Sequence, residues 1–185
     1  GHADLAGILK YGFSDGRSVL ERASSRETAA RVAVGAVCKI FLDEFNIGIS
    51  SRVLLVGGET KRALIQKKIQ DAIKKKVTVC GIFEVIAKGV SPGLGSYAQY
   101  DRRLSAILAA GVVSIPGIKA VEIGLGAGYA YKFGSQCHDV IFYSKGGFYR
   151  KTNNAGGLEG GITNGEDIVI RACMKPIATL GKPLP

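Results

Sequence analysis

A long stretch of helical periodicity with almost no polar face constrains the fold of this chain most. Apolar residues recur at helical spacing between Ala29 and Phe45, at positions 29, 32, 33, 36, 37, 40, 41 and 45. The remaining face carries small side chains such as Ala30, Val34 and Gly35. A helix that is apolar on most sides is typical of a buried element, so we expect this helix to be covered on several sides.

The ends of this helix are marked by local signals. Ser24 and Glu27 have the spacing of a capping box, in which each side chain accepts a hydrogen bond from the other residue's amide. Asn46 and Gly48 are residue types that end helices. The polar, glycine-containing stretch before the cap, residues 11–23, is predicted to be a loop.

The rest of the chain alternates between strand and helix patterns without a strict βαβ order. Helices are expected at Lys61 to Lys76 and Asp101 to Ser114, and a turn-rich loop at Ser91 to Ser96. Strands are expected at Ile49–Val56, Gly81–Lys88, Ala120–Ile123, Val140–Tyr143 and Ile168–Met174. This order favours an α+β fold over a doubly wound parallel sheet.

Composition excludes several classes of protein. Of 185 residues, 46% are hydrophobic and 22% charged, which is a globular balance and neither disordered nor fibrous. The longest apolar run, Ile107 to Ile115, is too short for a membrane span and is followed by Pro116. A net charge of +10 predicts attraction to anions, either nucleic acid, an anionic membrane or a phosphorylated small molecule, or else only a solvated basic surface.

The four cysteines give no sign of a disulfide framework or a zinc site. Cys38, Cys80, Cys137 and Cys173 are far apart and form no C-x-x-C pair. No metal site is therefore expected, and the thiols are expected to be reduced, as in a cytoplasm.

Two segments are candidates for anion binding. Residues 21–28 place two arginines and two serines at the mouth of the capped helix, where free amides and the helix dipole favour anions. Residues 153–165 contain five glycines, which allow close approach to a ligand; the alternative is a wide hairpin with tight bends.

His138 follows Cys137 directly, but a Cys–His nucleophile pair needs the two side chains to approach each other. Neighbouring side chains on a strand point apart, so His138 is interpreted as structural.

Six motifs taken in order resemble chorismate synthase. The resemblance covers essentially the whole chain and about the middle half of the family's length, without the family's Gly-Glu-Ser-His segment and pair of arginines in front or its Arg-His-Asp-Pro segment behind. We therefore expect residues 1–185 to be one core fragment of that family. The motifs are Gly1-His2-Ala3-Asp4, Arg22 to Ala29, Pro92 to Gly95, Val121 to Gly124, Asn153 to Gly165, and Arg171-Ala172-x-x-Lys175-Pro176.

The resemblance implies a fold and an activity. The fold is a β-α-β sandwich with helices packed between antiparallel sheets, in a homotetramer. The activity is the last step of the shikimate pathway, in aromatic amino acid biosynthesis. This lyase converts 5-enolpyruvylshikimate 3-phosphate to chorismate and phosphate by an anti-1,4-elimination. The flavoprotein needs reduced FMN, although the reaction involves no net redox change. The resemblance also implies an association with NADP, a cytoplasmic location and no nucleic-acid or membrane partner. Whether the protein reduces its own flavin stays open.

The resemblance also implies site residues. His2 matches a catalytic histidine placed to protonate the reduced flavin, and Arg26 matches a substrate-binding arginine. Pro116 and Gly117 match a flavin-contacting pair that differs in many family members. The other matches to flavin contacts are Arg22, Ala23, Ser24, Gly160, Lys175, Pro176, Ile177, Ala178 and Thr179.

Two alternatives remain open from the sequence. A basic RNA-binding module would also suit the net charge, although the chain's few aromatic residues are not interleaved with its basic ones. A generic FMN oxidoreductase would instead transfer a hydride to an acceptor.

Overall fold

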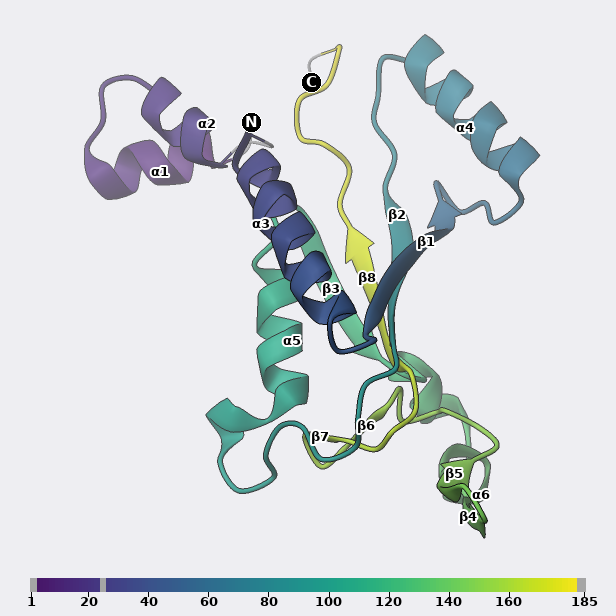
Figure 1. The fold of residues 1–185 in the computed structure, drawn as a ribbon. Helices are drawn as coiled ribbons and strands as arrows, with labels where there is room; N and C mark the ends of the chain where they lie inside the picture. The colour runs from purple at the N-terminus through teal and green to yellow at the C-terminus, as the bar shows by residue number, and fades with distance from the viewer. Residues whose placement is uncertain (1–2, 24–25, 183–185) are drawn as a thin grey trace.

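A four-stranded antiparallel sheet organises the computed structural model, which describes residues 3–23 and 26–182. The strands lie in the order β1-β2-β8-β3 (Figure 1). Their bounds are β1 Gly48–Val56, β2 Gly81–Lys88, β8 Ile168–Met174 and β3 Ile118–Ile123. The predicted strands in these regions are confirmed, and those of β2 and β8 match to the residue. The mixture of helices with antiparallel strands confirms the α+β class.

Helices α3 (Arg26–Asp43) and α5 (Leu104–Val113) lie on one side of this sheet (Figure 1). The core forms where alternate residues of β8 point toward α5, as a strand's period of two requires. Ile168 and Ile170 are each 6% exposed, and they cluster with Val90 and Leu158. Side chains from β2, β3 and α5 pack around this cluster: Ala87, Val121, Ile123, Leu104, Leu108 and Val112.

Helix α3 is less covered than its sequence predicts. None of its residues is buried, and Val32, Val37 and Phe41 are 66%, 67% and 62% exposed. Arg31 ties the helix to the end of α5 by donating hydrogen bonds to the hydroxyl and the carbonyl of Ser114. The expectation of cover on several sides therefore fails within the described residues, because no other described element lies against the outer face of α3.

The predicted loop over residues 11–23 is wrong for its second half. Helix α1 (Asp4–Tyr11) precedes it, and residues 17–23 form helix α2 (Arg17–Ala23). Asp15 starts α2 by accepting hydrogen bonds from the amide and the guanidinium of Arg17. Val19 of α2 is buried directly against Gly7 of α1, where a side chain would overlap it. A helix this short has a weak sequence signal, and its packing on α1 stabilises it.

The remaining elements complete the chain and agree broadly with the predicted ones. Helix α4 (Arg62–Lys74) follows β1, and the predicted helix from Asp101 begins instead as a 3₁₀ turn, η1 (Tyr100–Arg102), before α5. Beyond β3 come η2 (Gly126–Tyr131), α6 (Gly134–Cys137) and a hairpin of β4 (Ile141–Ser144) and β5 (Gly147–Arg150). No described helix is both long and apolar enough to cross a membrane.

Part of the glycine-rich segment forms a hairpin with a two-residue turn, which is narrower than the wide hairpin that the sequence left as an alternative. Its strands are β6 (Leu158–Glu159) and β7 (Ile162–Thr163). Gly160 and Gly161 make the turn with φ of +61° and +93°, a region that side-chain-bearing residues rarely adopt. The hairpin lies at the end of the sheet where β8 begins (Figure 1).

Candidate functional site

A pocket of about 480 Å³ lies at the end of β8, where three segments that are distant in sequence meet. One wall is the chain that leaves β8, the second is the turn between α5 and β3, and the third comes from Ala3, Ala23 and Thr28 near α2 and α3. Seven residues with predicted flavin contacts line it: Ala23, Pro116, Gly117, Lys175, Pro176, Ile177 and Ala178.

Two hydrogen bonds, one between backbone groups and one from a side chain, hold these walls in place. The amide of Lys175 donates to the carbonyl of Gly117 at 2.8 Å, which joins the β8 exit to the α5–β3 turn. Gly117 has a φ of +90°, so the turn favours glycine at this position. The Thr78 hydroxyl donates to the carbonyl of Ile177 at 2.8 Å, which holds the segment after β8 against the loop before β2.

A second cavity of about 580 Å³ adjoins the first between α1 and α2. Ala3 and Ala23 line both cavities, so the two share a boundary. Arg22 and Lys10 both line the second cavity, and the rest of its lining is mostly apolar. Together the two cavities offer apolar walls with cations at their edges.

The 480 Å³ pocket has the charge and the size to hold an anionic ligand. Lys119 and Lys175 line it, and neither forms an ion pair within the described parts of the chain. Its volume falls within the range of roughly 300–1,000 Å³ typical of small-molecule sites. Small side chains at Ala23 and Ala178, and the absence of a side chain at Gly117, leave room in this pocket for a flat group.

Several predicted site residues lie elsewhere. Thr179 follows the pocket wall and is exposed, while Gly160 lies in the β6–β7 turn beside Tyr97, outside this pocket. Arg26 is exposed and pairs with Glu21 at 2.5 Å. His2 and Ser24 lie outside the described residues, so the capping box is not described either.

Sequence reasoning missed two polar residues of the pocket, Thr28 and Lys119. Both were detectable in principle, because Thr28 lies within the motif from Arg22 to Ala29 and Lys119 follows Pro116-Gly117 by two residues. Neither has a spacing that marks it as a ligand contact. Only the fold, which brings the start of β3 opposite α3, shows that both face one pocket.

An acidic residue outside this pocket organises the glycine-rich segment. Asp139 accepts hydrogen bonds from the Thr152 hydroxyl and from the amides of Asn154 and Ala155 at 2.5, 2.9 and 2.8 Å. Burial opposes ionisation of Asp139, but these hydrogen bonds and the charge of Arg150 outweigh it and lower the pKa of that carboxyl. Its neighbour His138 lies near Gly134, and neither residue lines the 480 Å³ pocket.

Three comparisons with known proteins agree on one family. The family model described as "Chorismate synthase" matches residues 1–185. The chain is 56% identical over 185 residues to the chorismate synthase of Caldanaerobacter subterraneus subsp. tengcongensis, covering 100% of the chain and 53% of that relative. It is 50% identical over 218 residues to the Geobacter sulfurreducens chorismate synthase, covering 100% of the chain and 56% of that relative.

A solved structure titled "Crystal Structure of Chorismate Synthase" has the same fold. It superposes with a TM-score of 0.91 at 45% sequence identity, over 95% of this chain and 62% of that one. The chain thus spans about half the length of the curated relatives it matches.

Proposed function

The chain belongs to the chorismate synthase family, and on that premise we propose that the protein containing it is a lyase of the shikimate pathway. It converts 5-enolpyruvylshikimate 3-phosphate to chorismate and phosphate. In this anti-1,4-elimination a ring proton and the phosphate group leave from opposite faces. One observation carries the proposal: residues from distant motifs that match the family's flavin contacts line one pocket.

The pocket fits a reduced FMN cofactor in charge and shape. FMN carries a dianionic phosphate and a flat ring system that is apolar at one edge and polar at the other, and the pocket offers Lys119 and Lys175 beside small or apolar residues. Lysine is a common phosphate-binding residue because its ammonium is a compact charge. When bound in this pocket, the reduced flavin would supply electron density for the loss of the phosphate group.

Roles for the remaining predicted residues follow from their family matches. His2 is the proton donor, and Arg26 binds an anionic group of the substrate. The exposed Arg26–Glu21 pair supports this role, because its ion pair is open to solvent, with side chains 74% and 54% exposed. An exposed pair contributes only about 0–1 kcal/mol, so Glu21 is displaced by a substrate anion at low cost.

Family membership favours this enzyme over an RNA-binding module or a generic flavin oxidoreductase. Within the proposal the protein acts in the cytoplasm on a small phosphorylated substrate, as a homotetramer. Gly160 and the 480 Å³ pocket are on separate parts of one chain, so any contact of Gly160 with that flavin would come from a second copy.

An anaerobic assay tests the proposal directly. The full-length protein, supplied with dithionite-reduced FMN and 5-enolpyruvylshikimate 3-phosphate, should release phosphate and form chorismate. The Lys175→Gln variant should bind FMN at least tenfold more weakly, as expected for the loss of a charged hydrogen bond. Lys75→Gln is the matched control, because Lys75 is an exposed lysine at the end of α4.

Two results would count against the proposal. Equal product formation without flavin would exclude the FMN-dependent elimination. Equal loss of FMN affinity in the Lys175→Gln and Lys75→Gln variants would show that general positive charge, rather than the pocket, holds the cofactor.

A further inference from the structure

A row of alternating charges crosses the face of the sheet opposite α3 and α5. The strand register places Arg52 of β1 beside Glu84 of β2, Glu84 beside Arg171 of β8, and Arg171 beside Glu122 of β3. Glu84 is only 1% exposed, although it lies on the side of the sheet without these helices. The two arginines cover it.

The arginines engage Glu84 but do not use all their donors on it. Arg171 donates from Nε to Glu84 at 2.8 Å and from Nη1 to the carbonyl of Gly124 at 3.1 Å. Arg52 donates to the other carboxylate oxygen from Nε at 2.8 Å, with its Nη2 at 2.6 Å. Arg171 Nη2 and Arg52 Nη1 have no partner among the described residues, so two guanidinium nitrogens remain to bind a further acceptor.

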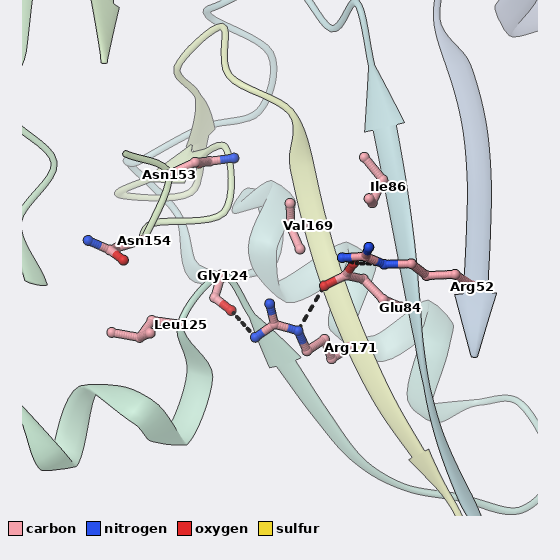
Figure 2. A pocket seen from close by; sticks show the side chains of 9 residues that line it. All are labelled: Arg52, Glu84, Ile86, Gly124, Leu125, Asn153, Asn154, Val169 and Arg171. Atoms are coloured by element: carbon pink, nitrogen blue, oxygen red, sulfur yellow. Dashed lines mark hydrogen bonds and ion pairs between the residues drawn. The ribbon is translucent and has the colours of Figure 1, made fainter. Parts of the chain in front are cut away.

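These nitrogens border a hollow of about 230 Å³ (Figure 2). Figure 2 shows Glu84 held between the two guanidinium groups, with Ile86 and Val169 beside them on the same face of the sheet. Leu125 and Asn154 line the hollow from the loops beyond the sheet. Glu122, at the end of the row, is not part of its lining and accepts a hydrogen bond from the amide of Ala127.

We propose that this hollow is a binding site for a small monocarboxylate with an apolar body. The carboxylate would bind the free nitrogens of Arg52 and Arg171, and the apolar body would lie over Ile86 and Val169. This site is separate from the proposed flavin pocket, because the two share no lining residue.

Charge and volume select this class of ligand. Two guanidinium groups and one buried carboxylate leave a single positive charge in the lining, which matches one carboxylate. Arginine binds carboxylates well because its donors form a planar fork. A volume below the usual range of roughly 300–1,000 Å³ excludes large ligands such as nucleotides.

The test is a titration of the full-length protein with three small-molecule probes. The dissociation constant of each probe is measured from its NMR chemical shifts during the titration. Benzoate carries both the charge and the ring, benzamide carries the ring alone, and inorganic phosphate carries charge alone. We expect benzoate to bind at least tenfold more tightly than either of the others. Arg52→Gln and Asn154→Asp should each weaken benzoate binding about tenfold or more, through loss of a charged donor or addition of a repelling charge.

Two matched variants locate the binding. Lys88→Gln removes a positive charge from an exposed side chain of β2, the strand that carries Glu84 and Ile86. Lys119→Gln removes a positive charge from the proposed flavin pocket. Both should leave the benzoate dissociation constant unchanged. Since Arg52→Gln leaves Glu84 with one partner, circular dichroism should check its folding; if it unfolds, Asn154→Asp decides.

Several results would overturn the inference. They are no saturable binding of benzoate, equal binding of benzamide, or benzoate binding that survives Asn154→Asp. A loss in Lys119→Gln without a loss in Asn154→Asp would place the anion in the flavin pocket. The outcome is independent of the proposed function, since it requires neither FMN nor catalysis.

Discussion

The charged residues of this protein differ in how far their ion pairs are exposed to solvent. Arg26 and Glu21 form a pair in solvent, whereas Glu84 is enclosed by two arginines. An exposed pair contributes little to stability, and a buried carboxylate contributes more because removing its partners leaves an uncompensated charge. Mutation of Arg26 is therefore expected to leave the stability of the fold nearly unchanged, whereas mutation of Glu84 is expected to lower it.

Replacing Arg26 should affect the substrate and not the fold. Arg26→Ala should raise the substrate's dissociation constant more than tenfold, because a charged hydrogen bond is lost, with a shift in melting temperature close to zero. Glu21→Ala is the matched control, since it removes the same ion pair and leaves Arg26 in place. A large drop in melting temperature with unchanged substrate affinity in Arg26→Ala would make this arginine structural instead.

Glu84 should make the stability of the fold depend on pH in the acidic range. Burial opposes ionisation of Glu84, but hydrogen bonds and charge from Arg52 and Arg171 outweigh it and lower its pKa below the ordinary value of 4.5. A carboxyl with a lowered pKa in the folded state stabilises above its unfolded pKa, and the benefit is lost as pH falls through the folded pKa.

Melting temperatures of the wild type and of Glu84→Gln, measured from pH 6 downward, test this. At pH 6 the variant should be less stable by about 1–3 kcal/mol, since it leaves two arginines without their carboxylate. The difference should shrink below about pH 4. A constant difference across this pH range would contradict the assignment.

At the scale of elements, glycines decide how closely loops approach the sheet. Gly124, at the end of β3, has a φ of +58°, and a Cβ there would overlap the carbonyl oxygen of Asn154. The amide of Leu125 donates to that same carbonyl at 2.7 Å. The loop before β6 is therefore held against β3 by contacts that no larger residue allows.

Gly124→Ala should lower the free energy of unfolding by about 2–4 kcal/mol, through both overlap and an unfavourable φ. Gly111→Ala is the contrasting variant, because Gly111 lies in α5 and a Cβ added to it would meet open space. It should stabilise the protein by about 0.5–1 kcal/mol. Urea denaturation of both variants measures the two effects; a loss of similar size in both would refute the steric account.

At the scale of the whole molecule, the described chain leaves much apolar surface exposed. Large apolar side chains stand open along α3, where Val34 and Ile40 are 63% and 66% exposed, and relatives have nearly as many residues outside the matched region as within it. Exposed apolar patches of this kind mark surfaces that another segment or chain covers.

A polypeptide of residues 1–185 alone should therefore bind FMN weakly and release no phosphate. Anion sites lose about 1.5–3 kcal/mol for each missing charged hydrogen bond. Residues 1–185 lack the Gly-Glu-Ser-His segment, the pair of arginines and the Arg-His-Asp-Pro segment that the resemblance to the family implies on either side. Fluorescence titration with FMN, followed by the phosphate assay, measures both properties beside the full-length protein. The length of the polypeptide should be verified by mass spectrometry. Full activity from residues 1–185 would show that flanking segments are not essential for catalysis.

The sequence by itself determined which segments become strands and helices wherever the pattern was long, as in β2, β8 and α3, because side-chain periodicity is a local property. It also supplied the motifs that identify the family. It did not predict α2, whose stability comes from Val19 packing on Gly7 of another helix.

Only the tertiary structure decided which distant residues meet. The pocket joins Ala23, Gly117 and Lys175, and the charge row joins Arg52, Glu84 and Arg171. It also separated Gly160 from the seven predicted flavin contacts that line the pocket. The physical reason is strand register: it sets which residues of separate strands lie side by side, and a shift of one residue would move Glu84 to the opposite face of the sheet.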